Sequence, residues 1–212
     1  MKTPVIASEW VRIVEYPGHH LNDFCMFRDG RGRWHAVGIK GTGTWASEQS
    51  LFHAVGTDLS RRFENCADLL VQRPPEGTAP QKHAPFVVFD GALYRMFYRR
   101  PKGTILHLAT ADPDRWDGLG EVLFERRDAR DVCIERIRGV YHMYYCQCED
   151  VDGVPRSAIL LRRSADLMQW DGPVVVHVDA TRPAPHSYLE SPYVIEGPGG
   201  YYLFIRHRLM DE

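Results

Sequence analysis

The sequence has no long apolar run and no excess of either charge, and these two shortages exclude whole classes of protein. No stretch approaches the ~18 consecutive apolar residues of a membrane-spanning helix, and residues 1–16 lack the apolar core of a signal peptide. The 26 basic and 28 acidic residues give a net charge of −2 without a basic stripe. We therefore expect no membrane partner and no nucleic-acid partner. The chain as given is expected to be cytoplasmic, or extracytoplasmic if a signal has been removed.

Cysteine is also scarce, and the five that occur are an odd number without the spacing of a secreted disulfide scaffold. Cys146 and Cys148 would share one face of a strand, but no second Cys or His pair shows the spacing of metal ligands. We therefore predict free, mostly buried thiols and no metal site. Long helical periodicity is missing as well, so helices should be few and short.

A repeat organises the residues that are present. Four hairpins recur at 23–39, 84–99, 131–146 and 191–206, each with a β-rich strand, a glycine-containing turn and an aromatic-rich strand. A second signature places Asp58, Asp112 and Asp166 at intervals of 54 residues, each followed four or five positions later by an aromatic residue. We expect these aspartates to cap turns, and the aromatic residues to cover the edge of the next unit.

A period near 54 residues with about four strands per unit predicts an all-β fold, a β-propeller. Residues 1–212 would form a single incomplete propeller domain with blades at 21–72, 83–125 and 130–178 and a half-blade at 190–208. A closed ring needs at least four complete blades, so the chain would be a truncated product, a fragment, or a chain that closes by association. The second strands should supply an aromatic core between blades, from Tyr94, Phe97, Tyr141, Tyr144, Tyr202 and Phe204.

Three units place a carboxylate where the innermost strand of a propeller blade begins. Asp23 opens blade one, Asp131 opens blade three and Glu190 opens blade four, whereas blade two has His83 at this place. These groups would meet at one end of the central channel. Cleavage of a glycosidic bond needs two carboxyl groups of different pKa, and a third carboxylate can raise the pKa of the acid by charge repulsion.

Four neighbouring residues are candidates for contacts with a sugar. Asn22 and His83 lie at the same strand entrances as the acids. Arg130 would bind a substrate hydroxyl or pair with an acid. Trp45, in the Gly-Thr-Gly-Thr-Trp loop, would stack on a sugar or pack between blades.

The motifs around these residues carry a resemblance to known families. ESPYVIEGPGGYYLF resembles the Glu-small-Pro-aromatic motif around the general acid of glycoside hydrolase family 43, and HAPFVVFDGALYRMFY is similar to the Ala-Pro strand and hairpin of that family. HLNDFCMFRDGRGRWHAV is similar to the Asn-Asp-Pro-Asn-Gly segment of family 32, which holds the nucleophile. RDVCIERIRGVYHMYY resembles the Arg-Asp-Pro or Asp-Pro segments of both families.

The resemblance implies a five-bladed propeller with an Asp, Asp, Glu triad that acts on furanose or pentose glycans such as arabinosides, xylosides or fructosides. Asp23 would be the base or nucleophile, Asp131 the residue that tunes the pKa and orients the transition state, and Glu190 the general acid. An apolar setting would keep Glu190 protonated near neutral pH. Phe24 and Val132 replace the prolines that follow the aspartates in the families.

The implied partner is an oligo- or polysaccharide, and self-association through the unpaired last blade is expected as well. No organic cofactor is implied, and a structural divalent cation such as calcium in the pore stays an open alternative. Two rival functions also stay open. One is a glycan-binding propeller or an inactive fragment. The other is a glycan phosphorylase, which would need a cluster of cations at the pore where the sequence indicates little beyond Arg130 and Lys82.

Overall fold

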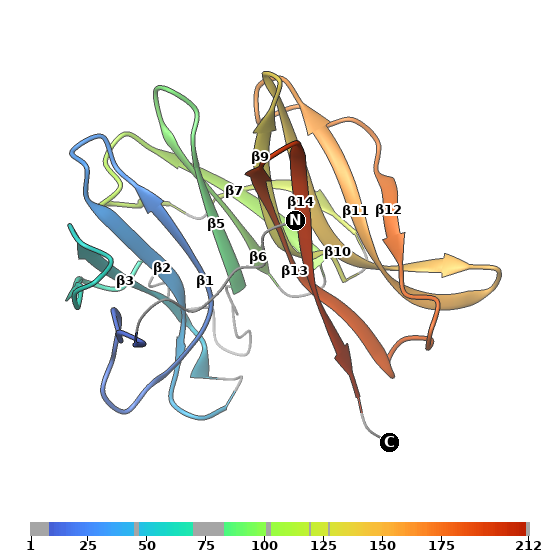
Figure 1. Cartoon of the computed structure of the whole chain (residues 1–212), viewed down its shortest axis with the longest axis horizontal. Helices are drawn as coiled ribbons and strands as arrows, with labels where there is room; N and C mark the ends of the chain where they lie inside the picture. Colours follow the sequence, from blue (N-terminus) through green and yellow to red (C-terminus); the bar gives the residue numbers. More distant parts are fainter. Residues whose placement is uncertain are drawn as a thin grey trace.

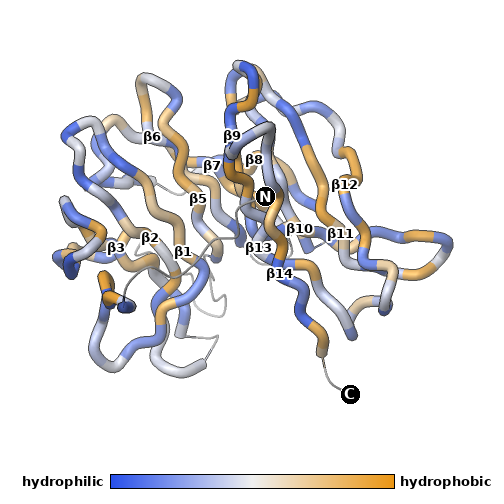
Figure 2. The backbone as a smooth tube through the Cα atoms, viewed as in Figure 1, coloured by the Kyte–Doolittle hydropathy of each residue, from blue (hydrophilic) through white to orange (hydrophobic). Residues whose placement is uncertain are grey.

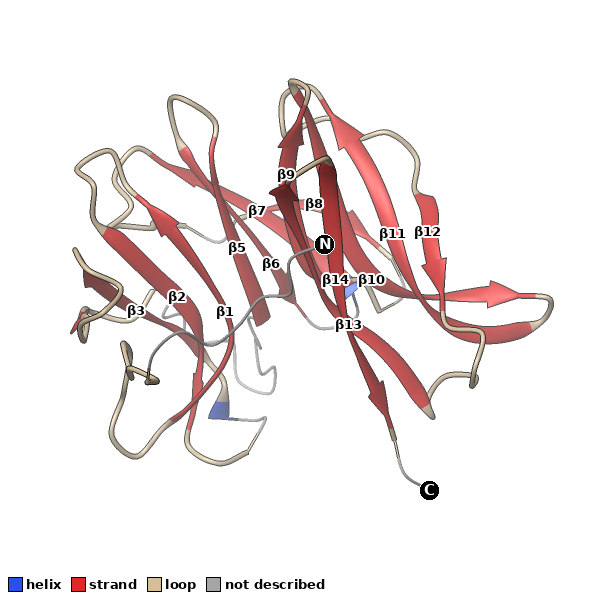
Figure 3. Cartoon of the chain, viewed as in Figure 1, coloured by secondary structure: helices blue, strands red, loops and turns tan. Residues whose placement is uncertain are grey.

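The computed structural model describes residues 9–44, 47–69, 83–100, 103–118, 120–126 and 128–210, which form four antiparallel sheets (Figure 3). The short blue segments in the figure are 3₁₀ residues, at positions 47 and 103, and none of the described residues is α-helical. The predicted all-β class is therefore confirmed. Because these residues form no α-helix, they contain no helix that is long and apolar enough to cross a membrane.

Each sheet follows the chain, so that every strand pairs with its neighbours in sequence (Figure 1). Blade one contains β1 (His20–Arg28), β2 (Trp34–Gly41), β3 (Ser50–Gly56) and β4 (Glu64–Asn65). Blade two contains β5 (His83–Phe89), β6 (Tyr94–Arg100), β7 (Thr104–Thr110) and β8 (Glu121–Glu125). Blade three contains β9 (Arg130–Ile137), β10 (Val140–Val151), β11 (Val154–Ser164) and β12 (Val174–Val178). Blade four contains β13 (Ser187–Gly197) and β14 (Gly200–Leu209).

The arrangement of these sheets is the predicted propeller, with three four-stranded blades and one two-stranded blade. The innermost strands are neighbours in space, since β1 packs on β5, β5 on β9, and β9 on β13. Channel-facing residues of all four blades therefore approach one another although they are distant in sequence.

The core lies between the blades and is built from alternate residues of the strands. Val37, Ile39 and Met96 belong to the cluster between blades one and two, and Met143 and Leu160 belong to the cluster between blades two and three. Each is at most 1% exposed, and full burial of such a side chain stabilises a fold by about 1.5–3 kcal/mol. Figure 2 shows the resulting apolar segments along the inner strands.

The three aspartates of the 54-residue repeat cap turns, as predicted. The Oδ1 atom of Asp58 accepts a hydrogen bond from the backbone N–H of Ser60 at 2.8 Å, and Asp112 and Asp166 accept equivalent bonds from residues 114 and 168. Because such a bond replaces a missing backbone partner, it fixes the turn between the outer strands. Of the aromatic residues that follow, Phe63 and Trp116 belong to core clusters, and Trp170 is partly buried and packs against one.

The predicted aromatic core between blades is wrong for the last blade. Tyr202 is 39% exposed and Phe204 is 53% exposed, whereas Tyr94, Phe97 and Tyr141 are buried. The physical reason is that their face of the two-stranded sheet is left uncovered by the other described strands.

Candidate active site

The site is built on a backbone irregularity that recurs in each innermost strand. Near the start of β1, β5, β9 and β13 the pairing with the second strand shifts by one residue, which is a β-bulge. Each bulge contains a residue in the left-handed conformation: Asp23 (φ 35°), Ala84 (φ 48°), Asp131 (φ 57°) and Ser191 (φ 51°). This conformation costs a residue with a Cβ about 1–2 kcal/mol. Because it recurs in all four blades despite this cost, it belongs to the fold and is not a local accident.

The bulges correct one expectation about the carboxylates. Asp23 and Asp131 occupy equivalent bulge positions, but Glu190 lies one residue before its bulge, at the position of Asn22 and His83 in blades one and two. A bulge puts two residues of one strand opposite one residue of its partner, so consecutive side chains can face the same side. This explains how Glu190 and the two aspartates can reach one cavity from different repeat positions.

A cavity of about 260 Å³ lies where these strands begin, and it brings together most of the predicted site residues. It is lined by the three proposed catalytic acids, by Asn22, His83 and Arg130, and by residues that the sequence did not indicate. Beneath it, a narrower cavity of about 90 Å³ is lined by the bulge residues and the residues that follow them. Trp45 and Lys82 lie outside the described residues.

Asp23 has an unusual protonation equilibrium in this cavity. Burial raises the pKa of its carboxyl, the negative charges of Asp131 and Glu190 add to the effect, and the result is a pKa of about 6. The carboxyl of Asp23 therefore changes protonation state near neutral pH, where general acid–base catalysis is most effective.

Asp131 links blade three to blade four. Its Oδ2 atom accepts a hydrogen bond of 3.0 Å from the backbone N–H of Ser191, the residue directly after Glu190, and the thiol of Cys146 lies 3.9 Å from the same oxygen. The contact with Ser191 holds the carboxylate of Asp131 in a fixed position relative to the bulge that carries Glu190.

Glu190 is not in an apolar setting, so the apolar environment predicted for it is wrong. Its two carboxylate oxygens lie 3.8 Å from Nη1 of Arg206 and 4.0 Å from Nη1 of Arg208, and its side chain is 19% exposed. The physical reason is the register of the last hairpin. The bulge in β13 places Arg206, on β14, opposite Glu190.

A buried glutamate that the sequence analysis missed supports the wall of the cavity. Glu48 is 3% exposed, and its oxygens lie 3.0 Å from Nε2 of His20 and 3.4 Å from Nε2 of His83. Burial lowers the pKa of His83, although the charge of Glu48 opposes that effect. Glu48 thus connects blade one to the entrance of blade two, and its charge also contributes to the raised pKa of Asp23.

Arg130 is paired with an acid, which is one of its two expected roles. Its Nη1 atom lies 2.6 Å from Oδ2 of Asp128, its Nη2 atom donates to the carbonyl of Leu189 at 3.3 Å, and its guanidinium lies 5.3 Å from the centre of the Tyr188 ring. These contacts fix the guanidinium at the cavity wall. Asp128 is a fourth acid in the cavity, and no motif pointed to it.

The cavity contains more positive charge than the sequence indicated. Four arginines line it, namely Arg99, Arg130, Arg206 and Arg208. The prediction that the cavity contains too few cations for a phosphorylase is therefore wrong. Arg99 and Arg206 occupy equivalent places, since each lies on the second strand of its blade opposite the residue that precedes the bulge. Counting back from the hairpin turns would have located both arginines within one residue, but the bulges decide the final register.

The comparisons with known proteins agree with this architecture. No protein-family model matches the chain, and no curated protein matches its sequence. Among solved structures, a thermostable family 43 glycoside hydrolase is similar at a TM-score of 0.67 and 20% identity, over 87% of this chain and 63% of that one. An α-L-arabinanase from Cellvibrio cellulosa is similar at a TM-score of 0.64 and 12% identity, over 90% of this chain and 69% of that one.

A family 32 β-fructofuranosidase from Bombyx mori is also similar, with a TM-score of 0.65 and 16% identity over 87% of this chain and 41% of that one. The chain thus has the propeller fold of glycoside hydrolases of families 43 and 32. It spans 63% of the length of the thermostable hydrolase, so it matches a part of that protein.

Proposed function

We propose that this chain carries the catalytic site of a glycoside hydrolase that acts on furanose or pentose glycans, such as arabinosides, xylosides or fructosides. The observation that carries the proposal is the meeting of Asp23, Asp131 and Glu190, from three blades, in one cavity. Glycosidic cleavage requires such a group of carboxyls. The likeness to hydrolases of families 43 and 32 supports it, because in this fold those proteins act on glycans of this kind.

In this proposal Asp23 acts as base or nucleophile, Glu190 as general acid, and Asp131 as the group that orients the transition state. The raised pKa of Asp23 supports an acid–base role for that residue. The hydrogen bond from Ser191 to Asp131 supports a positioning role, since it couples the acid of blade three to the strand of Glu190.

The test is hydrolysis of a panel of nitrophenyl glycosides and natural oligosaccharides by the wild-type chain and two variants. We expect Asp23→Asn to abolish turnover of every substrate, because no base remains. Glu190→Gln should still cleave substrates with activated leaving groups slowly, since those need little acid assistance. Glu196→Gln, on the exposed part of β13, is the control and should retain full activity.

The outcomes separate the assignments. Slow cleavage by Asp23→Asn together with inactive Glu190→Gln would reverse the two roles. Full activity of both variants would refute this site. Binding of an oligosaccharide without any cleavage would make the chain a glycan-binding propeller.

We further propose that the reaction inverts the anomeric configuration, because the longer motif match is to family 43. Inverting enzymes separate the two carboxyls by about 6.5–9.5 Å to admit a water molecule, whereas retaining enzymes separate them by about 5–5.5 Å. Proton NMR of the first-formed product decides the question. A product with the configuration of the substrate would make Asp23 a nucleophile.

A phosphorylase is the second candidate, and the four arginines of the cavity favour it. A guanidinium group can bind two phosphate oxygens at once through two of its N–H groups. A cavity lined by arginines would therefore accept phosphate in place of water. Cleavage of the same panel with and without inorganic phosphate distinguishes the two reactions. Formation of a sugar phosphate identifies a phosphorylase, and free sugar at an unchanged rate identifies a hydrolase.

A further inference from the structure

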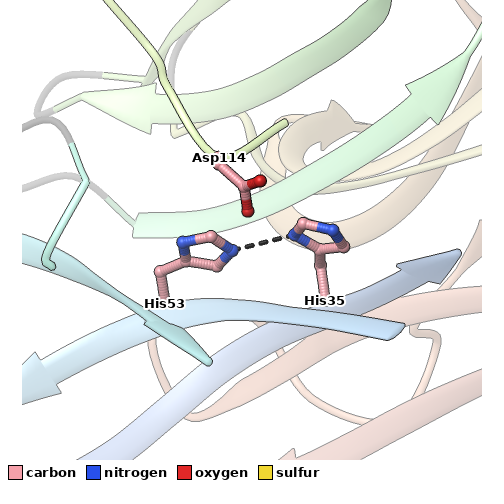
Figure 4. A group of neighbouring side chains, drawn as sticks. All are labelled: His35, His53 and Asp114. Atoms are coloured by element: carbon pink, nitrogen blue, oxygen red, sulfur yellow. Dashed lines mark hydrogen bonds between the residues drawn. The ribbon is translucent and has the colours of Figure 1, made fainter. Parts of the chain in front are cut away.

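Two buried histidines face each other at the boundary between blades one and two, and one of them, His35, lies opposite Phe27 near the end of β1. Nδ1 of His35, on β2, lies 2.9 Å from Nε2 of His53, on β3, and the two residues are 0% and 1% exposed. A carboxylate oxygen of Asp114, in the turn after β7 of blade two, completes a group whose ligand atoms all lie within 4.8 Å of one another. In Figure 4 one oxygen of Asp114 points toward the space between the two rings.

His35 is held in an orientation that suits a metal ligand. Oδ2 of Asp29 lies 3.2 Å from the other ring nitrogen of His35, Nε2. A histidine that ligates a metal commonly donates its second N–H to a carboxylate, which fixes the tautomer and directs the lone pair of the first nitrogen at the metal. Two nitrogens bound to one tetrahedral Zn²⁺ are about 3.3 Å apart, given Zn–N bonds of about 2.0–2.1 Å. The observed 2.9 Å therefore needs only a small adjustment.

Blade two offers an internal comparison, because its hairpin turn is closed in the same way. The N–H of Asp29 donates to the carbonyl of Arg33, and the N–H of Asp90 donates to the carbonyl of Leu93. The strand registers then make three positions of the two blades equivalent, and the 54-residue repeat adds a fourth, in the turns of blades two and three. Asp29 corresponds to Asp90, His35 to Arg95, His53 to His107, and Asp114 to Met168.

In blade two a guanidinium occupies the place between the equivalent groups. Arg95 forms a hydrogen bond with Asp90, its Nη1 atom lies 3.2 Å from Nε2 of His107, and the same atom lies 3.4 Å from the sulfur of Met168. The protein thus supplies its own cation there. In blade one the arginine is replaced by a second imidazole, and the thioether is replaced by a carboxylate, so the group consists of metal-ligand types.

Arg33 does not fill this place in blade one. Its guanidinium binds the carboxylates on either side, at 2.8 Å from Oδ2 of Asp29 and 2.7 Å from Oδ2 of Asp114. The two imidazole nitrogens face each other without it. His53 and Asp114 also line a cavity of about 570 Å³ that is open to solvent, which provides a path for a metal ion and room for a water ligand.

We propose that His35, His53 and Asp114 form a binding site for a divalent first-row transition metal, Zn²⁺ in the first place, which joins blade one to blade two. The three residues supply three ligands, and water from the cavity supplies the remaining one. His53 takes up the metal by a change of tautomer, since its ring proton moves from Nε2 to Nδ1. His35 keeps the N–H that points at Asp29.

The experiment is titration of the metal-free chain with Zn²⁺ by calorimetry, together with the visible absorption spectrum of the chain loaded with Co²⁺. We expect one Zn²⁺ per chain and the intense spectrum of four-coordinate Co²⁺ for the wild type. His53→Gln should weaken Zn²⁺ binding at least about 100-fold and abolish the spectrum, because it removes a ligand. His107→Gln is the matched control in blade two and should bind Zn²⁺ within twofold of the wild type.

Absence of stoichiometric Zn²⁺ binding by the wild type would overturn the proposal. An equal loss in His107→Gln and His53→Gln would overturn it as well, because it would show general destabilisation. Circular dichroism verifies the fold of each variant. Should His53→Gln not fold, Asp114→Asn replaces a partly exposed turn residue and should weaken Zn²⁺ binding at least about tenfold.

Discussion

Asp23 carries a carboxyl whose protonation state in the cavity changes near pH 6. Because its pKa is about 6 and the proposed base must be ionised, we expect kcat/KM to fall with a slope of one as the pH drops below about 6. A pH–rate profile from pH 4 to pH 8 measures this. Activity that stays constant down to pH 4 would contradict the base role of Asp23.

The same carboxyl should make the wild-type chain less stable at neutral pH. The folded pKa of about 6 lies above the ordinary value of 3.8, so the folded state binds more protons between pH 4 and pH 6, and stability falls as the pH rises through this interval. Asn has no charge to bury. Asp23→Asn should therefore raise the free energy of unfolding by about 1–3 kcal/mol at pH 8 and leave it nearly unchanged at pH 4.

Denaturant unfolding at the two pH values measures this difference. Asp166→Asn, in an exposed turn, is a suitable control and should show no gain at pH 8. A stability gain of Asp23→Asn that is equal at both pH values would contradict the electrostatic explanation.

At this scale the sequence indicated some of the residues at the cavity and its wall and missed others. Asp23, Asp131 and Glu190 could be found because motif and repeat both mark the start of the innermost strand. Arg206 and Glu48 could not be found in that way. Arg206 reaches Glu190 only through the register set by a bulge, and Glu48 reaches His83 through contact between blades. Counting from the hairpin turn places Arg206 only to within one residue, and the contact between blades leaves no local pattern in the chain.

At the scale of the strand, the left-handed residue in each innermost strand is the feature with the clearest energetic effect. Ala84 has a φ of 48° and a methyl side chain, so it bears the cost of this conformation without the polar function of Asp23 or Asp131. We expect Ala84→Gly to raise the free energy of unfolding by about 0.5–1 kcal/mol, because the relief of strain exceeds the entropy that glycine loses on folding.

Ala36→Gly, in the buried middle of β2, is the matched control and should destabilise the chain. Denaturant unfolding compares the two variants. A loss of stability in Ala84→Gly as large as in Ala36→Gly would mean that the bulge tolerates alanine without strain.

The bulges themselves were not predicted, although the strands that carry them were. Alternation of apolar residues and a glycine turn are enough to indicate a hairpin. A bulge changes the alternation at one residue only, and in this chain the changed residues are as different as aspartate, alanine and serine. Their common property is a backbone angle, which no side-chain pattern records.

At the scale of the whole molecule, blade four exposes an apolar face. Tyr193 pairs with Phe204 and Ile195 pairs with Tyr202 across the two strands, so the four side chains share one face, and each is between 39% and 54% exposed. Apolar patches of this kind mark surfaces of association. We expect the chain to self-associate at high concentration, as its sequence predicted.

Light scattering of the wild type and of the double variant Tyr193→Lys/Phe204→Glu tests this expectation. The variant should be monomeric, because the charges interrupt the patch. Val122→Lys, which changes an exposed residue on β8, should leave the association unchanged. A monodisperse wild-type monomer at high concentration would refute the prediction.

The overall architecture could be predicted from the sequence because the same pattern of strands and turns recurs from blade to blade. The Asp112 and Asp166 turns and the four hairpins each support the same unit of about four strands. The group of His35, His53 and Asp114, proposed above as a metal site, shows the opposite case, since it appears once among the described residues and combines side chains of two blades. Spacing along the chain could not reveal it.

The four bulges also indicate how such a scaffold can change its chemistry without changing its shape. Each one presents a side chain to the channel from the same backbone geometry, and two of the four, Ala84 and Ser191, present a side chain without charge. The equivalent positions in the other two blades, Asp23 and Asp131, hold acids. A single codon change at Ala84 or Ser191 would introduce a new functional group at a predetermined angle, so a propeller of this type can acquire or lose a catalytic set one blade at a time.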